Sequence, residues 1–130
     1  MASSFFWVWK EESQGAWGCF DHDAASDTYT ERAAVKKALA HVRPRRIAGF
    51  PTAFGFDRAA GRFSLAFHAE PEVTAPHEID VPEAMGPVLS VQCDGKDITS
   101  TSSRDGTVLT VACGGADGFD HALTVDVAPL

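Results

Sequence analysis

The chain has 130 residues, of which 45% are hydrophobic and 22% are charged, and its net charge is −7 at pH 7. This length and composition are typical of one globular domain, with room for at most a small part of a second. The longest apolar run, Phe5 to Trp9, is far shorter than the roughly 20 residues of a membrane-spanning helix. We also expect no signal peptide, because no basic region precedes this run, and no nucleic-acid partner, because the net charge is negative.

The charge is unevenly distributed along the chain. Residues 32–62 hold eight basic side chains and one acidic side chain, whereas the segments before and after them are acidic. This pattern has two interpretations. The basic middle either joins two different environments or forms a solvated helix face beside an acidic sheet.

The first predicted element is a strand over residues 4–10, SFFWVWK. Strand alternation places Phe5, Trp7 and Trp9 on one face, and the other face also begins with apolar side chains. A strand that is apolar on both faces is typical of a buried strand in an α/β fold.

The next segment is expected to be a loop followed by a helix. Residues 11–27 are polar and rich in turn-forming residues, and Thr28 with Glu31 fits a capping box. Apolar side chains at helical spacing then predict a helix from Glu31 to about Arg43, which Pro44 would end. Residues 1–46 are therefore expected to form one β/α unit.

Short runs rich in β-branched and aromatic residues, separated by turn residues, follow Pro44. These runs are Thr52–Phe56, Arg62–His68, His77–Val81, Val88–Cys93, Thr107–Cys113 and Ala122–Val127. The pattern predicts a mainly β fold, with an antiparallel β-sandwich of about six to eight strands over residues 47–130. Phe63, Leu65 and Phe67 share one face and are assigned to its core, whereas both faces of residues 107–112 are apolar, so the buried face of that strand stays open.

Three cysteines, Cys19, Cys93 and Cys113, cannot all pair within one chain, and no CxxC motif indicates a zinc site. Cys93 and Cys113 each end an apolar run. They can pair across a sheet or remain buried thiols, and we favour the thiols.

Other polar clusters give weaker signals. Asp21-His22-Asp23 contains metal-ligand residue types without further ligands at a recognisable spacing, so we interpret it as a solvated turn and expect neither a metal nor a cofactor. No catalytic triad can be argued for His68, His77 or Asp120-His121, because none has a serine or cysteine in a suitable turn.

Three arginines, Arg43, Arg45 and Arg46, lie close together after the expected helix. They can either bind an anionic headgroup or pair with acidic residues across the junction between the two parts. We favour the pairing.

The segment Phe6-Trp7-Val8-Trp9-Lys10-Glu11-Glu12, followed by Ala16-Trp17-Gly18, resembles the end of the barrel in family 5 glycoside hydrolases. Residues 42–51, VRPRRIAGFP, are similar to the junction between barrel and C-terminal β-sandwich in the endoglycosylceramidase-type branch. Residues 76–82, PHEIDVP, look like a strand of that sandwich. The resemblance covers nearly the whole chain and implies the last β/α unit of a TIM barrel followed by the C-terminal sandwich.

The resemblance also implies which site residues to expect. The two catalytic glutamates of the family follow the fourth and seventh barrel strands, and this chain corresponds to the eighth strand onward, so no catalytic residue is carried over. The family's sugar-stacking tryptophan corresponds to Trp7. Glu11 is the candidate for a hydrogen bond to a sugar hydroxyl, and Glu12 would then point the opposite way.

The sequence thus predicts a C-terminal part of a glycoside hydrolase that acts on O-glycosyl bonds of glycolipids or β-glucosides, and that is not catalytic by itself. The alternatives are a β-sandwich module that binds carbohydrate or a lipid headgroup, and a purely structural accessory domain. Residues 4–10 are expected to self-associate, to fold back on the chain or to dock on a barrel, because an isolated barrel strand exposes apolar side chains and unpaired backbone. The sequence does not indicate a location in the cell.

Overall fold

The computed structural model describes residues 19–129, and the chain divides into two compact units at the bond between Leu39 and Ala40. Each unit is described by itself.

The described part of the first unit is a hairpin followed by a short helix. Strands β1 (Phe20–Asp23) and β2 (Thr28–Glu31) pair antiparallel, and α1 (Ala33–Leu39) contains no buried residue. The hairpin turn is stabilised by the Asp23 carboxylate, which accepts hydrogen bonds from the Ala25 N–H and the Ser26 hydroxyl.

Two predictions for this unit are wrong. The expected capping box at Thr28 and Glu31 is instead strand β2, because these residues form ladder pairs with β1 and the Thr28 hydroxyl bonds to Ser26. The helix is shorter than predicted, Ala33–Leu39 rather than Glu31 to about Arg43. It ends before Arg43, whose position next to Pro44 disfavours helical backbone.

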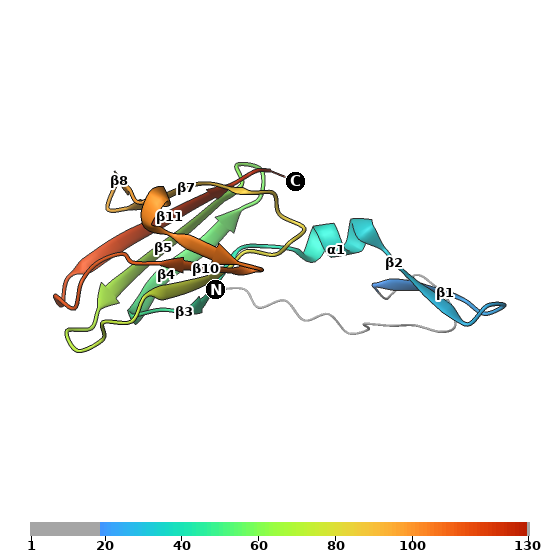
Figure 1. Ribbon diagram of the computed structural model, residues 1–130, viewed down its shortest axis with the longest axis horizontal. Coiled ribbons are helices and arrows are strands. Elements are labelled where there is room, and N and C mark those ends of the chain that lie inside the picture. Colours follow the sequence, from blue (N-terminus) through green and yellow to red (C-terminus); the bar gives the residue numbers. More distant parts are fainter. Residues whose placement is uncertain (1–18, 130) are drawn as a thin grey trace. The chain divides into compact units, whose positions relative to one another are not determined.

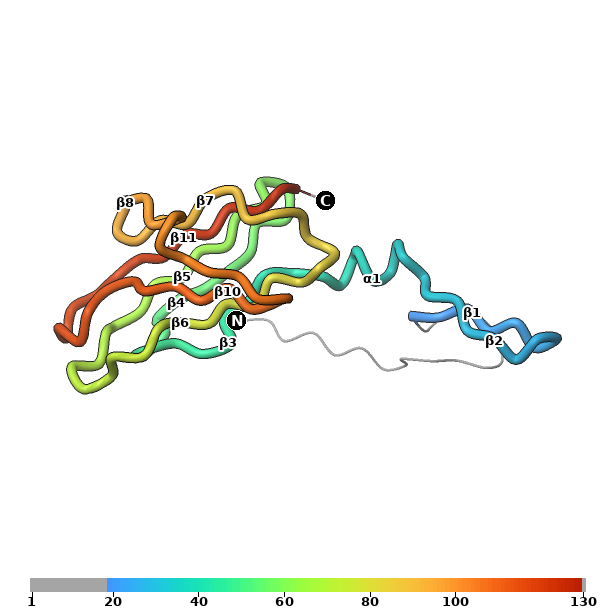
Figure 2. The backbone as a smooth tube through the Cα atoms, in the orientation of Figure 1, coloured from blue at the N-terminus to red at the C-terminus, as the bar shows by residue number. Residues whose placement is uncertain are grey.

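The second unit is a sandwich of two antiparallel sheets (Figures 1 and 2). The four-stranded sheet has the order β3 (Arg43–Arg46), β6 (His77–Asp80), β10 (Val108–Val111) and β9 (Ser103–Asp105). The five-stranded sheet has the order β4 (Gly49–Asp57), β5 (Arg62–Ala69), β11 (Asp120–Val127), β7 (Val88–Cys93) and β8 (Lys96–Asp97). A short 3-10 helix, η1 (Thr99–Thr101), follows β8. Each of the six predicted runs overlaps a strand, and the mainly β sandwich is confirmed.

The core lies between the inner faces of the two sheets. Phe63, Leu65 and Phe67 are at most 2% exposed, as predicted, and they alternate with outward-facing residues along β5. Strand β11, which lies beside β5 in Figure 2, contributes its own alternating apolar residues to the same cluster. The sequence did not indicate which face of β10 is buried. In the structure it is the face that carries Leu109 and Val111.

Residues 40–46 belong to the sandwich unit, although the sequence places them before the expected boundary at residue 47. Ala40 and Val42 are part of the buried core. Arg43–Arg46 forms strand β3, which pairs with β6. Proline lacks a backbone N–H donor and is therefore tolerated on an edge strand such as β3, where Pro44 lies.

Cys93 and Cys113 form a disulfide with a Cα–Cα distance of 5.4 Å, so the preference for buried thiols is wrong. Cys93 ends β7 of the five-stranded sheet, and Cys113 follows β10 of the four-stranded sheet. The bond therefore links the two sheets covalently. Cys19, in the first unit, carries a buried thiol.

Candidate functional site

Trp7 and Glu11, the predicted substrate-binding residues, lie outside the described residues, as does the segment 4–10. Their roles remain predictions. The described residues instead bring together a polar cluster at one end of the sandwich, next to the disulfide.

His77 occupies the buried side of this cluster. Its side chain is held by two backbone groups, because Nδ1 lies 3.2 Å from the Ala48 N–H and Nε2 lies 2.8 Å from the Cys113 carbonyl oxygen. A backbone N–H can only donate and a carbonyl can only accept, so Nδ1 accepts and Nε2 donates. His77 is therefore neutral, and burial accordingly lowers its pKa.

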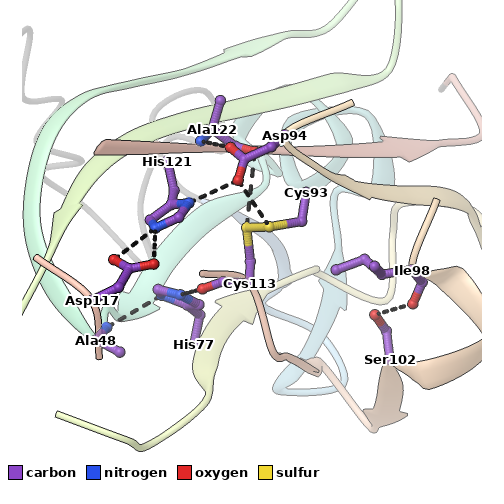
Figure 3. Close-up of a disulfide and its surroundings, with 10 residues drawn as sticks. All are labelled: Ala48, His77, Cys93, Asp94, Ile98, Ser102, Cys113, Asp117, His121 and Ala122. Atoms are coloured by element: carbon purple, nitrogen blue, oxygen red, sulfur yellow. Dashed lines mark hydrogen bonds and ion pairs between the residues drawn. A yellow bond between two sulfur atoms is a disulfide. The ribbon is translucent and has the colours of Figure 1, made fainter. Parts of the chain in front are cut away.

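His121, on β11, lies between two carboxylates (Figure 3). Its Nδ1 is 2.7 Å from Asp94 Oδ2, and its Nε2 is 3.1 Å from each carboxylate oxygen of Asp117. The His121 side chain is 12% exposed, so these contacts are partly shielded from water. The hydrogen bonds from His121 to Asp94 and Asp117 raise the pKa of the imidazole.

Phe67 contacts both histidines. Its ring centroid is 4.4 Å from that of His77 and 5.6 Å from that of His121. Two histidines, one with a lowered pKa and one with a raised pKa, therefore contact the same aromatic ring, beside a disulfide. We call His77, His121, Asp94 and Asp117 the histidine cluster.

A shallow cavity of about 340 Å³ lies near the cluster. It is lined mostly by small residues, which come from residues 73–76 after β5, from residues 112–116 after β10, and from Ala48. The glycine-rich loop after β10 thus forms one wall of the cavity and also carries Asp117.

The three arginines of the basic segment pair with acidic side chains of the neighbouring strand. Arg43 forms an ion pair with Asp80 at 2.9 Å, while Arg45 and Arg46 both pair with Glu78. The pairing is confirmed, but the acids belong to β6 of the same sheet rather than to the other side of a junction.

The Asp21-His22-Asp23 segment is not a turn but strand β1, because all three residues form ladder pairs with β2. His22 Nε2 contacts Asp27 Oδ1 at 3.0 Å, and its ring stacks on Tyr29. Within the described residues no group of three histidine, cysteine or acidic side chains is arranged to hold a metal ion.

The histidine cluster could not be found by sequence reasoning. His121 contacts Asp94, which is 27 residues away, and only the sheet register brings them together. The sequence does contain one local signal, since Asp94-Gly95 is a typical tight-turn pair and both residues have positive φ. The cluster lies beside the disulfide, and its imidazole and carboxylate groups can bind and release protons.

The two-layer antiparallel sandwich identifies the class of domain, and the comparisons with known proteins identify the family. Residues 43–125 match the family model described as glycoside hydrolase family 5 C-terminal domain. The chain belongs to this family. No curated protein matches the chain significantly.

Among solved structures, the chain is similar to endo-glycoceramidase II from Rhodococcus sp. Two such structures are 28% identical to it, with a TM-score of 0.58 for the enzyme itself and 0.57 for its complex with ganglioside GM3. The match covers 89% of this chain in both cases, but only 24% and 23% of those chains. The chain therefore spans about a quarter of the length of these relatives. Within residues 19–129 no helix is long and apolar enough to cross a membrane.

Proposed function

We propose that this chain is the non-catalytic C-terminal part of a glycoside hydrolase that acts on O-glycosyl bonds of glycolipids or β-glucosides. One observation carries the proposal. The family match over residues 43–125 falls within the sandwich unit that begins at Ala40, while the chain corresponds to about a quarter of a glycoceramidase.

The partners of the described carboxylates support a structural role for the sandwich. Retaining glycosidases need two carboxyl groups about 5–5.5 Å apart, one as nucleophile and one as acid and base. In the sandwich Glu78, Asp80 and Asp126 are instead paired with arginines of neighbouring strands. Asp94 and Asp117 are bound to His121.

The proposal extends to the residues before the sandwich. Residues 1–39 would supply the last β/α unit of the barrel, because the sandwich unit begins at Ala40, and residues 4–10 would dock on the other barrel strands. Trp7 would stack on the sugar next to the scissile bond, because an indole can cover the apolar face of a sugar ring. Glu11 would accept a hydrogen bond from a sugar hydroxyl. These roles rest on the resemblance of the aromatic motif to the eighth barrel strand of the family.

The first test is hydrolysis by the chain alone. We expect the purified 130-residue chain to leave both an aryl β-glucoside and a fluorescent glycosylceramide intact, because the family's two catalytic carboxylates have no counterpart in it. Turnover that disappears when a carboxylate of this chain is replaced would contradict the proposal. Tight binding of oligosaccharides by the isolated chain would favour the alternative of an independent carbohydrate-binding module.

The second test asks whether the chain completes a barrel. The matching C-terminal quarter of the Rhodococcus endo-glycoceramidase II is replaced by residues 1–130, and hydrolysis is measured. We expect an active chimera in which Trp7→Ala lowers kcat/KM about tenfold, equivalent to ~1.4 kcal/mol of transition-state binding. Glu11→Gln should also lower kcat/KM, whereas the neighbouring control Glu12→Gln should not. Equal effects of the two glutamate variants would remove the role of Glu11.

A further inference from the structure

His121 is placed where only its doubly protonated form satisfies both neighbours. Nδ1 faces Asp94 at 2.7 Å, and Nε2 faces both oxygens of Asp117 at 3.1 Å. A neutral imidazole has one N–H donor and one acceptor, whereas the imidazolium donates from both nitrogens. Because an ionised carboxylate can only accept hydrogen bonds, a neutral His121 would leave one carboxylate facing a nitrogen lone pair.

The proton belongs on His121 rather than on either carboxylate. Asp94 Oδ1 also accepts the Ala122 N–H at 2.8 Å, and Asp117 Oδ1 accepts the Phe119 N–H at 2.9 Å. These backbone donors favour the ionised carboxylates and, together with the hydrogen bonds from His121, lower the pKa of both Asp94 and Asp117.

The other titratable groups near His121 do not compete with Asp94 and Asp117 for its two ring nitrogens. His77 contacts the same Phe67 ring as His121 and is neutral, as its two backbone partners require. His68 and Asp120 pair with each other at 2.8 Å. His68 follows Phe67 in β5, and Asp120 precedes His121 in β11. Successive side chains of a strand point to opposite faces, so His68 and Asp120 lie on the face of the sheet opposite to Phe67 and His121.

The two carboxylates are not anchored equally. Asp94 follows the disulfide residue Cys93 directly and forms the tight turn before β8. Asp117 lies in the loop between β10 and β11, where Gly114 and Gly118 have positive φ. A Cβ at position 114 would lie 2.7 Å from the imidazole ring, so only glycine lets this loop pass so close to His121.

We propose that His121 is a pH-operated clasp for the loop formed by residues 114–118. When the imidazole is protonated, it ties this loop to the β7–β8 turn through Asp117 and Asp94. When the imidazole loses its proton, the shorter contact to Asp94 keeps the remaining N–H. The Asp117 carboxylate then faces a lone pair, and the loop is released.

The release has a defined extent. Cys113 stays attached to Cys93 through the disulfide, so the movement begins at residue 114. Gly114, Gly115 and Ala116 line the cavity near the cluster, and release of the loop therefore widens that cavity. Protonation of the partly buried His121 therefore controls access to the cavity at this end of the sandwich.

The sign of the pH dependence follows from the directions of the pKa shifts. The raised pKa of His121 means that its stabilising contribution is complete below about pH 6.5 and is lost as the pH rises through the higher folded-state value. The lowered pKa values of Asp94 and Asp117 mean that their contribution is complete above about pH 3.8 and is lost below it. The clasp is therefore closed in weakly acidic solution and opens on the alkaline side. His77 acts in the opposite direction, because its lowered pKa removes stability as the pH falls below 6.5.

The experiment measures the imidazole and the loop separately in the full-length chain. NMR follows the His121 ring through a pH titration, with His68 as the internal comparison because it contacts a single carboxylate. Amide hydrogen exchange, corrected for its intrinsic pH dependence, follows residues 114–118. We expect His121 to titrate above 6.5. As it does, the protection of the loop should fall about fivefold, the change expected from losing one ordinary hydrogen bond.

Three variants identify the cause. Asp117→Asn should abolish the fall in protection, because an amide can accept from the protonated ring and donate to the neutral one. His121→Gln should also abolish it, whereas His68→Gln should leave it unchanged. The proposal is overturned if His121 titrates at or below 6.5, if loop protection does not change with pH, or if the fall in protection persists in Asp117→Asn.

Discussion

The two units of this chain differ in what holds them together. The core cluster of the sandwich unit runs from Ala40 to Val127 and fills the space between two sheets. Within residues 19–39, by contrast, Cys19 is the buried hydrophobic residue, and α1 buries none. The hairpin and helix have exposed contacts, such as the ion pair between Lys36 and Glu31 at 3.1 Å.

This difference shows which unit can be stable by itself. Burial of a large apolar side chain stabilises by about 1.5–3 kcal/mol, whereas an exposed ion pair contributes about 0–1 kcal/mol. A helix shorter than about 12–15 residues is also marginal in water without packing. The free energy of unfolding of this chain is therefore expected to come from the sandwich.

A matched pair of substitutions gives the largest expected contrast between the units. Leu65 is 2% exposed and Leu39 is 39% exposed. Leu65→Ala and Leu39→Ala remove the same side-chain atoms. At Leu65 these atoms lie in a packed core and their loss leaves a cavity, so Leu65→Ala should lower the free energy of unfolding by about 2–5 kcal/mol. Leu39→Ala should lower it by less than about 0.5 kcal/mol. Urea unfolding followed by circular dichroism measures both, and comparable losses would contradict the division.

The disulfide gives the next largest effect. It joins residues separated by 20 positions, and closing a loop of this length restricts the unfolded chain by about 3 kcal/mol. Replacing both Cys93 and Cys113 by serine should lower the free energy of unfolding by about that amount. The matched control, Cys19→Ser, changes a cysteine in the other unit and should leave the sandwich transition in place. An equal effect of Cys19→Ser would show that the two units unfold together.

Removal of the first unit should have the smallest effect. Among residues 19–129 the core cluster includes none before Ala40, so deletion of residues 1–39 is expected to change the free energy of unfolding by less than about 0.5 kcal/mol. For a domain of this size that corresponds to a shift in Tm of no more than about 2–4 °C. Calorimetry of the two chains tests this, and loss of a cooperative transition in the shorter chain would show that residues 1–39 are part of the folding unit.

The strands that carry the core could be predicted from the sequence because their pattern is local. Phe63, Leu65 and Phe67 alternate with polar or small residues, and turn residues mark both ends of β5. The short strands β3, β8 and β9 were missed, because they have few apolar residues and exist through pairing with a neighbour. Thr28–Glu31 shows the same effect, since its capping-box pattern was overridden by pairing with β1.

The candidate sites divide in a similar way. The arginine pairs could be anticipated from an excess of basic residues near acidic segments, although not which acids they would contact. The sequence left the pairing of Cys93 with Cys113 open and did not indicate the histidine cluster, because the disulfide and the contact of His121 with Asp94 each join residues 20 or more positions apart. Their distances depend on how the two sheets are stacked, which periodicity does not specify.

The amino-acid sequence by itself therefore determined the class of the fold, the main strands and the resemblance to the end of a family 5 glycoside hydrolase. Alternation, turn residues and motifs are properties of neighbouring residues, and they can be recognised without coordinates. Only the tertiary structure decided the pairing of Cys93 with Cys113 and the contact of His121 with Asp94. Sheet register and the stacking of the two layers set those distances, because they bring together groups that the chain itself keeps far apart.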